Sequence, residues 1–150
     1  MRRIFITLMV VLGISAITIT STFSQVGMWV KKQDMPTARY AMASAVVNGN
    51  IYVIGGWGNG FLETVEMYDP RPDKWETKAS ISQGNLGVGA AVVNGKIYAI
   101  GGWTGGANSL STVEEYDPIT DTWTKKANMP TTEIGFQQQS LMESYMLLVA

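Results

Sequence analysis

The stretch VVNGNIYVIGGWGNG, residues 46–60, returns with few changes as VVNGKIYAIGGWTGG, residues 92–106. In each copy an Asn-Gly pair separates two apolar runs, and the second run ends in a glycine doublet. Asn-Gly between such runs is a strong hairpin signal, because a type I′ turn needs a positive φ at both central positions. The two stretches therefore predict one β-hairpin in each half of the chain.

Fixed landmarks extend the repetition beyond these hairpins. Trp29, Trp75 and Trp123 follow one another at intervals of 46 and 48 residues. The tyrosine of each Tyr-Asp-Pro triplet precedes a tryptophan by 7 positions, and only the segment between the glycine doublet and this tyrosine changes its length. Constant spacing indicates packed structure, and variable spacing indicates a loop. From Gln25 onward the sequence is therefore interpreted as a repeat array.

Each repeat is predicted to contain four short strands. The predicted strands cover residues 41–47, 51–54, 63–68 and 74–78 in the first repeat, and 89–93, 97–100, 112–116 and 122–126 in the second. Asp-Pro ends the third strand of each repeat, because proline fixes φ and cannot donate to a ladder. No convincing helical periodicity occurs beyond the N-terminal segment, so the fold class is all-β.

The composition excludes several kinds of active site. The chain has no Cys and no His, and its formal net charge is −1. Thiolate or imidazole metal sites, disulfides and Ser-His-Asp triads therefore cannot form within it. A surface without a basic excess offers no footprint for nucleic acid. No cofactor, metal site or catalytic residue is predicted, and Glu114 and Glu115 are expected to lie on a solvated strand edge.

The N-terminal residues 1–24 have the pattern of a signal peptide. Two arginines precede an apolar run over residues 4–17, and small residues precede Gln25. The alternative is an uncleaved membrane anchor, since residues 4–19 are only slightly short of the roughly 17–25 residues that span a bilayer. Both interpretations predict an extracytoplasmic protein, secreted or periplasmic, and the second adds contact with a membrane.

A glycine doublet after an apolar strand, then Tyr-Asp-Pro, then a tryptophan, at a period just under fifty residues, resembles the kelch repeat. The resemblance runs over residues 28–130 and implies that each repeat is one blade of a β-propeller. Residues 39–78 and 79–130 would form two complete blades, after an isolated outer strand and linker over residues 25–38. Glycines near the axis would allow close backbone approach, and aromatic rings would pack blade on blade. The residues with such structural roles are Gly55, Gly56, Tyr68, Trp75, Gly101, Gly102, Tyr116 and Trp123.

Two blades are fewer than the roughly four to eight that close a propeller. We therefore interpret the chain as the N-terminal part of a larger propeller, in which residues 28–32 complete a last blade. The open blade edges predict self-association. Residues 131–150 depart from the repeat, which requires a glycine near position 143 where a glutamate stands. This tail is interpreted either as a third blade read in a shifted frame, starting between Pro130 and Gln137, or as a true apolar C-terminal strand.

The resemblance implies that the loops on one face of the blades bind a ligand. These loops combine flat apolar rings with amide donors, which suits a protein or a carbohydrate, so the first hypothesis is an extracytoplasmic interaction module. The candidate binding residues are Arg39, Trp57, Asn59, Asn85, Trp103 and Asn108. The alternative for the two tryptophans is a structural role as caps of their blades, and the alternative for Arg39 is an ordinary solvated side chain.

The second hypothesis is a fragment of a carbohydrate enzyme. Among exported kelch-like enzymes, a copper radical oxidase requires Cys and His ligands, which this chain lacks. A sialic acid mutarotase is compatible with arginine and acidic residues on the loop face, so this enzyme class stays open. A third hypothesis is a structural fragment without a function of its own.

Overall fold

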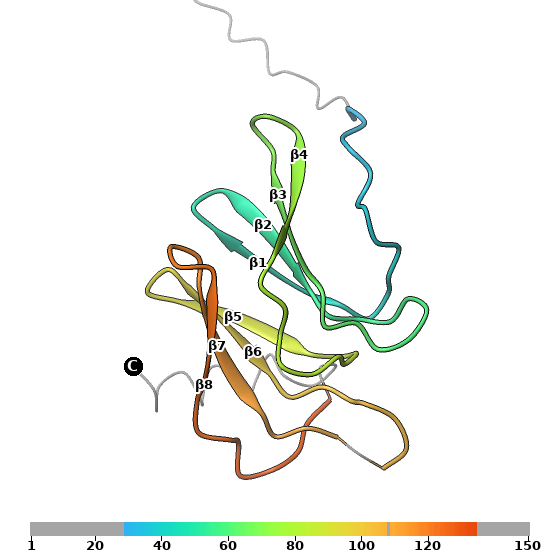
Figure 1. Ribbon diagram of the computed structural model, residues 1–150, viewed down its shortest axis with the longest axis vertical. Coiled ribbons are helices and arrows are strands. Elements are labelled where there is room, and N and C mark those ends of the chain that lie inside the picture. The colour runs from blue at the N-terminus through green and yellow to red at the C-terminus, as the bar shows by residue number, and fades with distance from the viewer. Residues whose placement is uncertain (1–28, 108, 135–150) are drawn as a thin grey trace, which may run out of the picture. The chain divides into compact units, whose positions relative to one another are not determined.

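The computed structural model describes residues 29–107 and 109–134 (Figure 1). The predicted leader, Asn108 and residues 135–150 of the predicted aberrant tail lie outside the described residues. All strands belong to one compact unit, Lys31–Ala150. Within the described ranges, no helix is long and apolar enough to cross a membrane.

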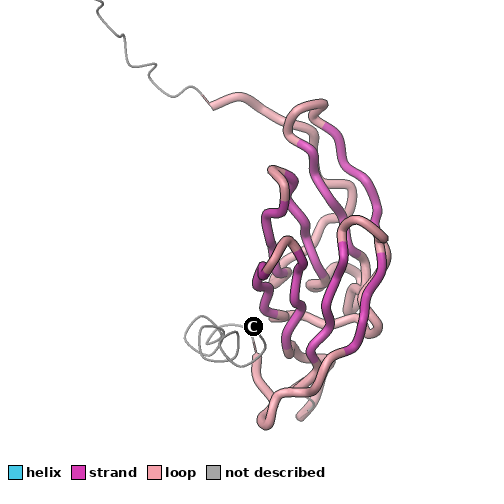
Figure 2. The backbone as a smooth tube through the Cα atoms, turned by 90° about the vertical axis from the view of Figure 1, so that its left-hand side faces the viewer, coloured by secondary structure: helices cyan, strands magenta, loops and turns pink. Residues whose placement is uncertain are grey.

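Eight strands form two four-stranded antiparallel sheets, ordered β1-β2-β3-β4 and β5-β6-β7-β8. The strands are β1 (Ala43–Val47), β2 (Asn50–Ile54), β3 (Val65–Asp69), β4 (Lys74–Lys78), β5 (Gly89–Val93), β6 (Lys96–Ile100), β7 (Val113–Asp117) and β8 (Thr122–Lys125). Figure 2 shows strands and loops and no helix in the described part of the chain. The predicted all-β fold with two four-stranded blades is confirmed. We call the sheet of β1–β4 blade 1 and the sheet of β5–β8 blade 2.

Both predicted hairpin turns are present. Asn48 and Gly49 have φ values of 53° and 81°, and Asn94 and Gly95 have values of 51° and 76°. The turns connect β1 to β2 and β5 to β6 in antiparallel register. Two positive φ angles in succession are the requirement of a type I′ turn, which explains why this dipeptide occurs in both repeats.

Residues 29–32, predicted as an isolated outer strand, lie outside the eight strands. The side chain of Trp29 is fully exposed, whereas Trp75 on β4 and Trp123 on β8 are half-buried. The outer strands β4 and β8 each pair with the third strand of their own blade. In the described part of the chain, residues 29–32 have no such partner strand, and their role in completing a further blade stays a prediction.

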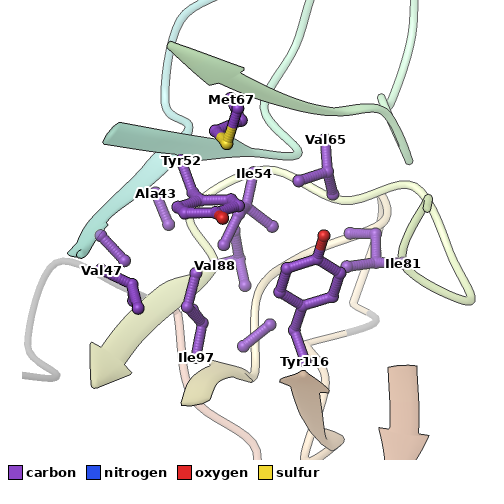
Figure 3. Close-up of a cluster of buried hydrophobic side chains, with 12 residues drawn as sticks. Ala43, Val47, Tyr52, Ile54, Val65, Met67, Ile81, Val88, Ile97 and Tyr116 are labelled. Carbon is purple, nitrogen blue, oxygen red and sulfur yellow. The ribbon is translucent and has the colours of Figure 1, made fainter. Parts of the chain in front are cut away.

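The main hydrophobic core lies between the two blades (Figure 3). Along β1, alternate side chains are buried and the intervening ones are exposed, as expected when one face of a strand is covered. Tyr52 of blade 1 meets Tyr116 of blade 2 edge to face, with ring centroids 5.7 Å apart. Ile54, Val65 and Ile97 are completely buried in the same cluster. Most of the buried hydrophobic residues therefore belong to one cluster that draws side chains from both blades.

A cluster of Tyr116, Asp121 and Trp123 holds the backbone N–H and carbonyl of Ala79, the first residue after blade 1. The Trp123 Nε1–H donates to the Ala79 carbonyl at 2.7 Å, and the Ala79 N–H donates to Asp121 Oδ1 at 2.9 Å. The Tyr116 hydroxyl donates to the same Oδ1 at 2.6 Å. We call this arrangement the peptide clasp. Blade 1 repeats it on Gln33 with Tyr68, Asp73 and Trp75.

The predicted structural residues therefore occupy equivalent positions in the two blades. Trp75 and Trp123 lie in equivalent settings on the outermost strands, and both are partly buried. The glycine doublets do allow close backbone approach. A Cβ on Gly56, where φ is +99°, would lie 2.8 Å from a backbone oxygen of the preceding loop.

Candidate binding face

The loops at one end of the strands are joined by backbone hydrogen bonds. Tyr40, in the loop before β1, exchanges two bonds with Trp57, in the loop after β2, at 3.0 and 2.9 Å. Leu86 and Trp103 repeat this exchange in blade 2, at 3.0 and 2.8 Å. The Gly56 N–H donates to the Asn85 carbonyl at 2.8 Å and so joins the two blades. We call the surface formed by these loops the loop face.

Three aromatic rings form a row across the loop face. Phe61 lies between the two tryptophans, with its ring centroid 4.6 Å from Trp57 and 5.7 Å from Trp103. The interplanar angles of 89° and 75° are those of edge-to-face packing. All three residues are partly exposed, so the row stabilises the loops and also presents apolar surface. Phe61 was missed in the sequence because its role depends on a ring from the other blade.

Arg39 differs from the exposed side chain that the sequence led us to expect. Its side chain is 0% exposed and that of Glu66 3%, and the two form an ion pair at 2.8 Å. The same guanidinium donates to the carbonyls of Gly55 and Thr64, at 2.9 and 2.8 Å. The hydroxyl of Thr37 donates to the other Glu66 oxygen at 2.8 Å. Arg39 therefore joins the ends of β2 and β3 from within, and its surroundings are those of a structural residue.

Asn85, another candidate binding residue, is also buried, with 4% of its surface exposed. Its amide lies between the glycine doublets of the two blades, since a Cβ on Gly55 or on Gly102 would come within 3.0 Å of its side chain. The side-chain Oδ1 has no hydrogen-bond partner, although it is buried. Most buried polar atoms have partners, so this oxygen is an unusual feature of blade 2.

The remaining candidates are divided between exposed and undescribed positions. Asn59 is exposed in the same loop as Trp57, which places an amide beside the aromatic row. Trp103 directs its Nε1–H to the carbonyl of Gly106 at 2.9 Å. Asn108 lies outside the described residues. The loop face thus brings together Trp57, Asn59 and Trp103, whereas Arg39 and Asn85 lie beneath it.

The expectation that Glu114 and Glu115 are solvated is wrong, because each is only 8% exposed. Glu115 accepts hydrogen bonds from the Tyr98 hydroxyl and from two lysines, Lys96 at 3.0 Å and Lys126 at 2.9 Å. The bond from Tyr98 is the main reason why the pKa of Glu115 falls to about 2. Among the described residues, no group of three or more acidic side chains could hold a metal ion.

Comparison with known proteins agrees with this architecture. The family model described as Kelch motif matches residues 38–81 and 85–130, which is more than half of the chain. The chain therefore belongs to the kelch motif family, whose repeats form β-propeller blades.

The similar proteins are longer than the segments matched. An F-box/kelch-repeat protein of Arabidopsis thaliana is 43% identical over 49 residues, which cover 31% of this chain and 13% of that protein. Beta-scruin of Limulus polyphemus is 39% identical over 57 residues, covering 37% of this chain and 6% of that protein. The solved structure of YjhT matches with a TM-score of 0.67 at 21% identity, covering 75% of this chain and 44% of that chain. The likeness to YjhT concerns the fold alone.

Proposed function

We propose that this chain is an extracytoplasmic interaction module that binds a protein ligand through its loop face. Membership of the kelch family supports the general class of interaction module. The observation that carries the proposal is the partly exposed aromatic row of Trp57, Phe61 and Trp103, which spans both blades. Aromatic side chains are enriched among the residues that dominate binding energy at protein interfaces.

The surroundings of the row suit a peptide or protein surface. Asn59 is exposed beside the rings and offers both a donor and an acceptor. The ring-to-ring packing holds Phe61 in place before any ligand arrives, and a preformed contact surface lowers the entropic cost of binding. A carbohydrate is the alternative ligand for the same surface, because sugars also pack on aromatic rings.

The test is a peptide selection against the full chain, followed by hydrogen-exchange mapping. We expect selected peptides to protect the loops after β2 and β6. Asn59→Ala and Phe61→Ala should each weaken binding, the latter by at least about tenfold. Ile119→Ala is the matched control, since Ile119 is 91% exposed in the turn at the opposite end of the strands. Equal weakening by the control, or protection of the β1–β2 turn instead, would contradict the proposal.

The predicted extracytoplasmic location forms part of the proposal and has its own measurement. Export followed by cleavage would give a mature chain that starts at Gln25, which the intact mass of the secreted or periplasmic protein reports directly. A chain of full mass in the membrane fraction would instead support the uncleaved anchor. The alternative of a sialic acid mutarotase-like enzyme stays a prediction, which an NMR assay of anomer exchange in sialic acid would test.

A further inference from the structure

The two blades differ at the position where blade 1 carries its buried guanidinium. In blade 1, Arg39 fills a cradle formed by the carbonyls of Gly55 and Thr64 and the carboxylate of Glu66. Asn85 takes the place of Arg39 in blade 2, one residue before the loop bridge to Trp103, as Arg39 comes one residue before the bridge to Trp57. An asparagine side chain is too short to make the contacts that Arg39 makes.

The acceptors of this cradle are nevertheless repeated in blade 2. Thr112 and Gly101 share a backbone hydrogen bond at 2.8 Å, as Thr64 and Gly55 do at 3.2 Å. Glu114 pairs with Ala99 in the sheet register, as Glu66 pairs with Val53. The carbonyls of Gly101 and Thr112 and the carboxylate of Glu114 therefore form the equivalent set, which we call the blade 2 cradle.

The carboxylate of the blade 2 cradle lacks the cation that its counterpart has. Glu114 is 8% exposed, and none of the ion pairs between described residues includes it. Its one hydrogen bond among these residues comes from the N–H of Ser82, at 3.3 Å. A buried carboxylate without a cation is energetically unfavourable. Asn85, whose side chain lies against Gly102, also carries a buried Oδ1 without a hydrogen-bond partner.

We propose that the blade 2 cradle binds the guanidinium of an arginine side chain supplied by the protein ligand. Blade 1 shows that a guanidinium matches this arrangement, because Arg39 donates to all three acceptors at 2.8–2.9 Å. The planar guanidinium has several donors in fixed directions, which an ammonium group does not. The backbone N–H of the exposed Ser82 donates to Glu114, so the carboxylate of the cradle lies next to a residue at the surface. The inference rests on the proposed function, since it names one side chain of the ligand.

The first experiment uses N-acetyl-arginine amide as the probe, with the full chain observed by NMR. We expect saturable shifts at Gly101 and Val113 and no comparable shifts at Val65, which is the counterpart of Val113 in blade 1. The citrulline analogue has the same shape without the charge and should not bind. Equal binding of the arginine and lysine analogues would overturn the assignment of a guanidinium, and equal binding of the citrulline analogue would overturn the role of charge.

Two variants test the cradle itself. Asn85→Arg places a guanidinium where blade 1 has one, so it should raise the urea midpoint and weaken probe binding by at least about tenfold. Glu114→Gln should also weaken the binding of the probe. Thr124→Arg is the control, because it adds the same charge at an exposed position of β8 and should change neither measurement. An Asn85→Arg variant that behaves like this control would overturn the proposal.

The outcomes separate this inference from the proposed function. If selected peptides protect the loop face but bind the Asn85→Arg variant as tightly as the parent chain, the proposed interaction module is supported and the arginine site in the cradle is refuted. If the arginine probe binds at Gly101 but no selected peptide protects the loop face, the cradle is supported as a guanidinium site and the proposed peptide-binding function is refuted.

Discussion

Replacing Arg39 by methionine tests how strongly the buried ion pair stabilises blade 1. The substitution keeps an apolar chain of similar length but leaves the Glu66 carboxylate, 3% exposed, with the Thr37 hydroxyl as its one remaining side-chain donor among the described residues. The carbonyl of Gly55 also loses the bond from Arg39, whereas Thr64 still accepts from the Gly55 N–H at 3.2 Å. Removing one partner of a buried pair costs about 3–5 kcal/mol. Small domains have only about 5–15 kcal/mol in total, so the loss is large.

The assay is urea unfolding at pH 7, followed by tryptophan fluorescence. Lys31→Met is the matched control, because Lys31 forms an ion pair of 3.1 Å with Asp34 in which both side chains are more than 80% exposed. An exposed pair of this kind contributes at most about 1 kcal/mol. The reasoning is refuted if Arg39→Met also costs less than about 1 kcal/mol.

A second variant keeps the test decisive if Arg39→Met does not fold. The double variant Arg39→Met/Glu66→Leu removes both charges, and replacing a buried pair by apolar residues is often neutral or stabilising. We therefore expect it to unfold within about 1 kcal/mol of the parent. Failure of the double variant to fold would show that the role of Arg39 is not mainly to neutralise Glu66.

Three further predictions concern acid stability, backbone approach and the peptide clasp. The folded pKa of Glu115, about 2, lies below its ordinary value of 4.5, so its contribution to stability is present above pH 4.5 and is lost as the pH falls toward 2. Glu115→Gln should therefore flatten the decline of the urea midpoint over this interval, and an unchanged slope would contradict the assigned pKa. Gly56→Ala should lower the free energy of unfolding more than Gly49→Ala does. Both glycines have a positive φ, which costs an alanine about 1–2 kcal/mol, but only at Gly56 would the new Cβ lie 2.8 Å from a backbone oxygen. Equal losses in urea unfolding would contradict this. Trp123→Phe keeps a smaller aromatic ring but loses the indole N–H and its 2.7 Å bond, so urea unfolding should show a loss of at least about 0.5–1.5 kcal/mol, and no loss would mean that the bond adds nothing.

The parts of the fold that depend on residues adjacent in the sequence were predictable. Asn-Gly specifies its turn locally, so both hairpins were placed correctly. The first strand was predicted to start at residue 41 but starts at Ala43, because Ala41 has a φ of 52° and belongs to the preceding loop. The residues adjacent to Ala41 in the sequence do not predict this positive φ.

The candidate site was harder to predict, because burial depends on residues far apart in the chain. Arg39 was expected on the surface, yet its partner Glu66 lies 27 positions away and only the folded sheet brings the two together. The same applies to Phe61, whose ring meets Trp103 from the other blade. A comparison of the repeats position by position shows that Glu66 has a counterpart in Glu114, but it does not show that both are buried.

The peptide clasp has a consequence for how such an array can lengthen during evolution. The clasp of blade 2 holds Ala79, which comes directly after β4, so it ties blade 2 to the end of blade 1. A gene duplication that copies residues 79–126 as one segment would carry the clasping side chains of blade 2 and the backbone of Ala79 that they hold. Each new copy would then bring its own attachment to its predecessor. The heritable module is therefore the segment from Ala79 to the start of β5 together with the sheet that follows it, and a crossover point inside this segment would separate Ala79 from the side chains that hold it.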